Sequence, residues 1–297
     1  MFKHPAYRMY IAEILALCAA VCIAMSGMFV SELQGRMPLL DLARVQMIAA
    51  FLMTAAASLA VGGWRSVEPW QLGFLAVSSF FGIIIASTTY FAAIYSAGPR
   101  TTALLFSLAS PFAVVLGYLF LGETLTGRQG LGITCVLAGI MLAIGRRPSK
   151  MAARTPWLGI GLGIVTAIGQ ALGSLAARPA MAGGVEPFTA MAVRSGIATL
   201  FFVALLLVPH PALKATSQIT RRSLGFAVGS AFFGVGLGMS LLMAALAHGN
   251  VGIVSTLSSM TPVVILPMVW ARTGIVPPPA AWIGAALAVV GTGLISL

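Results

Sequence analysis

The stretch Gly73-Phe-Leu-Ala-Val-Ser-Ser-Phe-Phe-Gly82 returns later in the chain as Gly225-Phe-Ala-Val-Gly-Ser-Ala-Phe-Phe-Gly234, with six of its ten positions identical. Helices rich in Gly and Phe can resemble one another by chance. However, other landmarks repeat in the same order at an offset of about 151 residues: Arg44 with Arg194, Leu108-Ala-Ser-Pro111 with Ser259-Met-Thr-Pro262, and Gly132 and Gly139 with Gly284 and Gly291. We therefore predict an internal duplication, with repeats at 1–147 and 148–297.

The composition excludes most classes of soluble protein. Of the 297 residues, 59% are hydrophobic and 8% are charged, whereas soluble domains average about 25% charged residues. The chain holds 17 Lys and Arg against 6 Asp and Glu, a net charge of +11. So few charges cannot cover the exterior of a soluble domain of this length. A soluble enzyme, a nucleic-acid-binding protein and a disordered chain are excluded, and the basic residues are expected to contact lipid headgroups.

The spacing of the charges predicts an all-α membrane protein. A membrane-spanning helix needs about 20 mostly apolar residues. Eight uncharged stretches fit one span each: 14–31, 45–64, 69–99, 101–122, 129–145, 155–177, 195–213 and 273–297. The stretch 223–271 is long enough for two spans, with a break at Ala247-His-Gly-Asn250. These runs are too long and too evenly apolar for the strands of a membrane β-barrel. A cleaved signal peptide could explain the N-terminus, but the further spans favour a first helix at 11–30, giving ten in all.

Five helices in each half place the two repeats in opposite orientations, because an odd number of spans ends on the other side of the membrane. Inverted repeats of this kind are typical of secondary transporters, which bind their substrate near the midplane between the repeats. The pattern therefore predicts a transporter that works by alternating access.

The segment Tyr118-Leu-Phe-Leu-Gly-Glu123-Thr-Leu-Thr-Gly-Arg-Gln-Gly-Leu-Gly132, with Pro111 upstream, resembles a signature of the drug/metabolite transporter superfamily and of its EamA-type members. The second half departs from it, since Gly274 occupies the position of Glu123. The resemblance covers the whole chain and implies a ten-helix transporter of amino acids, other metabolites or drugs. The chain is similar to inner-membrane exporters of aromatic and other amino acids.

Polar residues within the spans are candidates for the wall of a substrate cavity. Small polar stripes on the third, sixth and eighth predicted helices contain Ser78, Gln170 and Ser230, and Tyr90 is an aromatic candidate. The alternative is close packing, because small residues let helices approach one another in lipid. His248 and Asn250 could contact a substrate, or they could form an interfacial turn between two helices.

Charged residues and prolines in the spans form a second group of candidates. Arg44 and Arg194 could bind a substrate carboxylate or pair with an acid, or they could snorkel to the membrane surface. Glu13 could couple transport to protons, or it could stabilise a helix start. Glu123 is expected to be a structural part of the signature, and Pro111 and Pro262 to form paired kinks that assist gating.

The sequence contains no catalytic, nucleotide-binding or metal-binding motif. Its three histidines lie far apart, and Asp41 is its only aspartate. Cys18, Cys22 and Cys135 lie in apolar runs and are interpreted as packing residues without a disulfide or a metal. We expect no enzymatic activity, no cofactor and no nucleic-acid partner. The expected partners are a small-molecule substrate and membrane lipid, with the protein a monomer or a homodimer.

The sequence favours export of amino acids or related small metabolites across the bacterial inner membrane. A lipid or lipid-linked sugar flippase, an exporter of drugs or cations, and an intramembrane enzyme are the alternatives. The family resemblance implies cytoplasmic termini. Lys and Arg are nevertheless more frequent in the loops on the opposite side, which by the positive-inside rule favours external termini.

Overall fold

The structure is a computed structural model that describes residues 5–121, 126–145, 156–208, 219–248, 257–258 and 260–296. Every regular element within these ranges is a helix. The first half contains α1 (Pro5–Glu32), α2 (Leu39–Ala60), η1 (Gly63–Ser66), α3 (Pro69–Ser79), η2 (Phe80–Ile85), α4 (Ala86–Phe106), α5 (Ala109–Leu121) and α6 (Gly127–Gly145). The second contains α7 (Pro156–Ala182), α8 (Pro187–Ala204), η4 (Leu205–Leu207), α9 (Arg221–Ala231), η6 (Phe232–Gly238), α10 (Met239–His248), α12 (Thr261–Thr273) and α13 (Pro279–Ser296).

Within the described residues, six helical segments are long and apolar enough to cross a membrane. They are Ile11–Glu32, Leu39–Ala60, Pro69–Phe106, Trp157–Ala182, Pro187–Leu207 and Arg221–Ala245, and shorter apolar helices run over Gly127–Leu142 and Pro279–Ile295. Large apolar side chains such as Leu59, Leu131 and Leu200 point outward from these helices. Such a surface suits lipid, where helices satisfy their own backbone groups. The total of ten spans stays a prediction.

Two breaks interrupt the region where the third and fourth spans were expected. The first is at Gly98, whose φ of 81° and ψ of 163° are non-helical and which is followed by Pro99. The second separates the end of α4 at Phe106 from the start of α5 at Ala109. Pro111 explains the second break, because its ring would clash with the carbonyl of Ser107 in a continuous helix. The expected fourth span at 101–122 is therefore not one uninterrupted helix.

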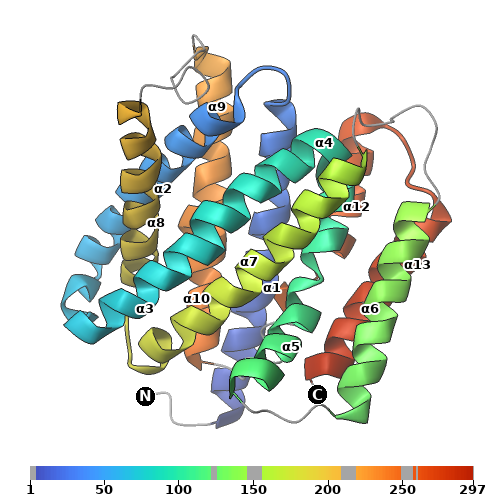
Figure 1. Cartoon of the computed structure of the whole chain (residues 1–297), viewed down its shortest axis with the longest axis horizontal. Helices are drawn as coiled ribbons and strands as arrows, with labels where there is room; N and C mark the ends of the chain where they lie inside the picture. Colours follow the sequence, from blue (N-terminus) through green and yellow to red (C-terminus); the bar gives the residue numbers. More distant parts are fainter. Residues whose placement is uncertain are drawn as a thin grey trace.

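The two halves pack against each other in a symmetric set of helix pairs. α2 contacts α8 and α6 contacts α13, so that each of these helices meets its own counterpart. The other pairs are themselves duplicated: α4 packs on α7 as α10 packs on α1, and α2 packs on α9 as α8 packs on α3. α1 begins and α13 ends at the lower end of the molecule in Figure 1. Such pairing is expected when one half is related to the other by a two-fold axis.

The glycines of α6 and α13 show that these two helices run in opposite directions. A Cβ on Gly132 would lie 2.6 Å from the carbonyl oxygen of Gly291, and a Cβ on Gly139 would lie 2.5 Å from that of Gly284. The contact thus joins the first glycine of one helix to the second glycine of the other. Figure 1 shows the pair side by side at one edge of the molecule. An antiparallel contact between equivalent residues is the arrangement that an inverted repeat requires.

The repeated stretches 73–82 and 225–234 lead into the same irregular element in both halves. Its Phe-Phe-Gly segment begins η2 in the first half and η6 in the second, and both are π-helical. π-helical turns inside longer helices are rare and occur frequently at functional sites. The glycines Gly82 and Gly234 lie within these turns, and both also line a pocket between the two halves.

Candidate functional site

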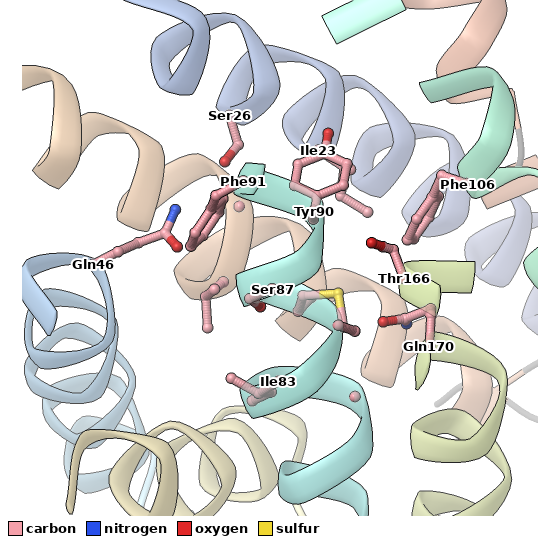
Figure 2. A pocket seen from close by; sticks show the side chains of 15 residues that line it. Ile23, Ser26, Gln46, Ile83, Ser87, Tyr90, Phe91, Phe106, Thr166 and Gln170 are labelled. Carbon is pink, nitrogen blue, oxygen red and sulfur yellow. The ribbon is translucent and has the colours of Figure 1, made fainter. Parts of the chain in front are cut away.

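A pocket of about 560 Å³ lies between the two halves, at the level of η2 and η6. Figure 2 shows it with Gln46 and Gln170 reaching in from opposite sides and side chains of α4 between them. Its lining comes from α1, α2, η2, α4, α7, η6 and α10: Ile23, Ser26, Gln46, Gly82, Ile83, Ala86, Ser87, Tyr90, Phe91, Phe106, Thr166, Gln170, Gly234, Val235 and Met239. A mostly apolar wall with a few polar groups is typical of small-molecule sites.

One wall carries a hydrogen-bonded cluster with a spare acceptor. Gln46 donates from Nε2 to Ser230 Oγ at 2.6 Å, and the hydroxyls of Ser230 and Ser26 lie 3.0 Å apart. The oxygen Oε1 of Gln46 is buried and has no hydrogen-bond partner in the described structure. A buried amide oxygen without a partner costs free energy. A ligand that donates a hydrogen bond in the pocket would recover that cost.

Tyr90 gives the pocket a second unpartnered polar group. Its ring is held edge-on by Phe91 and Phe106, with centroid distances of 6.2 and 6.0 Å. Its hydroxyl is buried and has no hydrogen-bond partner within the part of the chain that the structure describes. The result is an aromatic surface with one hydroxyl available to a ligand.

The opposite wall is formed by α7. Thr166 Oγ1 lies 2.8 Å from Thr89 Oγ1 and also donates to the carbonyl of Leu162. Gln170 is 7% exposed, and its Nε2 lies 3.5 Å from Ser174 Oγ, a long contact that leaves the amide free to bind elsewhere. The lining residues include no charged side chain.

The two arginines of the repeat occupy different environments, which corrects their predicted equivalence. Arg44 forms a buried salt bridge with Asp41 at 2.9 Å and donates from Nε to the carbonyl of Phe202. Arg194 is fully buried behind Gly82. Counted from the helix starts at Leu39 and Pro187, Arg194 is the eighth residue of α8, and the eighth residue of α2 is Gln46. The matching arginines in the sequence are therefore offset by two positions.

Of the residues selected from sequence, Tyr90 and Gln170 line the pocket. Ser230 reaches it through Gln46, whereas Ser78 donates to the carbonyl of Gly173 at 2.6 Å and serves helix packing. Pro111 and Pro262 lie in the first turns of α5 and α12, and Pro111 directly follows the break between α4 and α5. Their role in gating stays a prediction.

Four other residues selected from the sequence are not among the described lining residues. Glu13 lies on α1 ten residues before Ile23, about 15 Å from the pocket along the helix axis. His248 is the last residue of α10, and nothing is described of its side chain. Glu123 and Asn250 lie outside the described residues.

Sequence reasoning missed several residues of the lining. Gln46 and Ser26 were not selected, although each is a polar residue in the middle of an apolar run, the same signal that identified Gln170. Phe91 and Phe106 could not be separated from other apolar residues, because their role depends on which side of the helix faces the pocket.

A family model described as the EamA-like transporter family matches residues 10–145 and, a second time, residues 157–297. The chain belongs to this family. The two matches confirm the predicted resemblance and the duplication, while the boundary between 147 and 148 stays a prediction. EamA-like membership and the apolar helices together indicate a multi-pass membrane protein from a family of small-molecule transporters.

Solved structures share the fold of this EamA-like protein. One, titled "Crystal structure of protein", is 20% identical, covers 96% of each chain and has a TM-score of 0.72. This likeness concerns the fold alone. No curated protein matches the chain.

Proposed function

We propose that the protein is a secondary transporter that exports amino acids or related small metabolites across the bacterial inner membrane by alternating access. One observation carries this proposal: the pocket lies between two inverted halves and presents the unpartnered Gln46 Oε1 and Tyr90 hydroxyl. A site shared by inverted repeats can be opened to either side when one half moves against the other.

The chemistry of the lining supports a substrate with an apolar or aromatic part. Tyr90, Phe91 and Phe106 provide aromatic surface, and Met239 provides an adaptable apolar contact. The amides of Gln46 and Gln170 can bind an ammonium group and a carboxylate from opposite walls. An amino acid with an apolar side chain has both features.

A contact between the halves at the upper end in Figure 1 supports the gating part of the proposal. Glu32, the last residue of α1, accepts a hydrogen bond from Nε of Arg272 near the end of α12 at 2.6 Å. The half-exposed Arg272 makes this a weak interaction. A weak link between the two halves can break and re-form within a transport cycle.

Uptake into proteoliposomes tests the proposal. Vesicles loaded with unlabelled phenylalanine, tryptophan or leucine should accumulate the labelled amino acid by exchange faster than vesicles without protein. Glu13→Gln should abolish stimulation by a pH gradient if Glu13 couples transport to protons, while exchange continues. The proposal fails if no amino acid or related metabolite exchanges faster than in empty vesicles. Selective transport of lipids would instead identify a flippase, and selective transport of cationic drugs would identify a drug exporter.

A further inference from the structure

Arg194 is a buried cation next to the pocket. Its side chain is fully buried, and among the described residues it makes no salt bridge. Among the described residues, the hydrogen-bond partners of its Nη1 are sulfur atoms, those of Met191 at 3.3 Å and Met243 at 3.9 Å. Its Nε has no hydrogen-bond partner in the part of the chain that the structure describes. The guanidinium group is thus short of acceptors.

Such an arrangement is costly unless an anion is bound during function. A charge inside a membrane protein carries a desolvation penalty, and thioether sulfur is a weak acceptor. Shape alone does not account for the residue, because a methionine or leucine would fill the space without the penalty. Intramembrane arginines of this kind mark substrate pathways.

Arg194 packs against Gly82, a residue of the pocket lining. A Cβ on Gly82 would lie 2.8 Å from Arg194 Nη2 and 3.1 Å from the Cα of Gly173. Gly82 itself lines the pocket. The guanidinium therefore touches the outer face of the pocket wall, at the π-helical turn η2.

The repeat relates Arg194 to a residue that already lines the pocket. Arg194 and Gln46 are both the eighth residue of their helices, and these helices pack on each other. Gln46 and Gly234 both line the pocket. In the other half, Arg194 packs on Gly82, which is the counterpart of Gly234 in the repeat. The molecule is therefore asymmetric at this point: Gln46 of the first half lines the pocket, whereas Arg194 of the second half lies outside the lining.

We propose that Arg194 enters the pocket when the protein opens to its other side, and that it there binds the carboxylate of the substrate. In an inverted repeat, the two outward- and inward-open states arise when the halves exchange their conformations. Arg194 then takes the position in the pocket lining that Gln46 holds in this structure. The inference rests on the proposed function and narrows the substrate to molecules that carry a carboxylate or an equivalent anionic group.

Paired substrates test the recognition of the carboxylate. Phenylalanine and phenylalaninamide differ only at that group, so the wild-type protein should exchange phenylalanine at least tenfold faster. Arg194→Gln should remove most of this preference while exchange of phenylalaninamide stays within about threefold of wild type, and Arg194→Lys should keep part of it. Arg44→Gln is the matched control: it alters the arginine bound to Asp41 and should affect both compounds equally.

Equal transport of the two compounds by the wild-type protein, or an Arg194→Gln variant with an unchanged preference, would overturn the inference but leave the proposed function standing. The proposed function would be overturned if the protein transported neither compound and no other amino acid. The position of Arg194 is then decided separately by its accessibility.

Accessibility is measured with single cysteines in a background that lacks Cys18, Cys22 and Cys135. Gln46→Cys and Arg194→Cys should both react with a small charged thiol reagent that does not cross the membrane. Gln46→Cys should react when the reagent is added to one side of the vesicle, and Arg194→Cys when it is added to the other side. Phenylalanine should slow both reactions. An Arg194→Cys variant that reacts from neither side, in vesicles where Gln46→Cys reacts, contradicts the exchange of positions.

Discussion

The polar side chains within the spans fall into two groups according to whether their hydrogen bonds are complete. Ser78 and Ser79 donate to carbonyls of neighbouring helices, Gly173 and Arg194, at 2.6 Å each, and so join helices together. Gln46 and Tyr90 keep atoms without partners, and both line the pocket. Buried polar atoms are normally satisfied. Thr199 and Ser240 also carry hydroxyls without partners in the described structure, but they lie outside the pocket lining. An unpartnered atom therefore points to the binding site only where it also faces the pocket.

Tyr90→Phe should leave the fold intact and weaken substrate binding. The hydroxyl of Tyr90 makes no hydrogen bond in the described structure, so its removal leaves no other polar group unpaired. The free energy of unfolding should therefore change by less than about 1 kcal/mol. A substrate that hydrogen-bonds to this hydroxyl should bind about three- to tenfold more weakly. The apparent KM for exchange in proteoliposomes measures this effect, and thermal unfolding in detergent measures stability.

Tyr118→Phe is the matched control for this change, because Tyr118 is exposed on α5 outside the pocket lining. It should alter neither KM nor stability. An unchanged KM in Tyr90→Phe would show that the hydroxyl does not contact the substrate.

The sequence could identify only part of the site at this scale. Tyr90 and Gln170 stand out because large polar groups are rare within spans. Gln46 carries the same signal, but Arg44, two residues before it, was selected instead because it is charged and matches Arg194 in the repeat. The concealment of Arg194 behind Gly82 depends on a π-helical turn that no residue pattern reveals by itself.

At the scale of the element, glycines decide where helices touch and where they break. Gly132 and Gly139 let α6 approach the backbone of α13, and Gly98 gives α4 its non-helical link before Pro99. The sequence marked the first pair by its repetition in Gly284 and Gly291. It placed a boundary between spans near Gly98 and predicted a kink at Pro111, which lies just after the second break. It did not predict that the helix is interrupted there, since apolar content continues from Phe106 to Ala109.

Gly139→Ala should separate α6 from α13. The new Cβ would lie 2.5 Å from the carbonyl oxygen of Gly284 and 2.9 Å from the backbone nitrogen of Ala288, neither of which can move without shifting the helix. Overpacking of this kind costs about 1–3 kcal/mol. The measurement is the apparent melting temperature of the purified protein in detergent.

Gly130→Ala provides a control on the same helix, because a Cβ there meets nothing within 4 Å. It should be neutral or stabilising by up to about 1 kcal/mol, since alanine favours the helix. Equal melting temperatures for the two variants would contradict the close contact of α6 and α13.

Gly98→Ala should disturb the break in α4. The dihedral angles of Gly98, φ 81° and ψ 163°, are nearly restricted to glycine, and other residues there cost on the order of 1–3 kcal/mol. Nothing lies within 4 Å of an added Cβ, so the effect comes from the backbone alone. Melting temperature should fall, and Gly73→Ala, on an unstrained and equally open helical site of α3, should not lower it.

At the scale of the whole molecule, charge spacing and the repeat were enough to predict a helical membrane protein with two related halves. Both inferences depend on features that span many residues, so single exceptions do not disturb them. The sidedness of the chain is different, because it depends on a small difference in basic residues between loops. It needs a direct measurement.

Reporter fusions should find opposite sides for the ends of one half. Because each repeat is predicted to have five spans, a fusion after Gly62 should share the side of a C-terminal fusion, and a fusion after Gly145 should lie across the membrane. The family arrangement places Gly62 in the cytoplasm. A fluorescent protein that folds only in the cytoplasm and an alkaline phosphatase active only outside it give complementary readouts. Identical signals after Gly62 and Gly145 would contradict the inverted repeat.

The pairing of Gly132 with Gly291 and of Gly139 with Gly284 has a consequence for ancestry. Equivalent residues meet across this contact, and α2 meets its counterpart α8 in the same way. Such surfaces are self-complementary: a five-helix unit able to insert in both orientations could have assembled with an inverted copy of itself before the two copies were joined in one chain. The two halves would then have diverged after they were joined. The differences between Glu123 and Gly274, and between Gln46 and Arg194, would be results of this divergence.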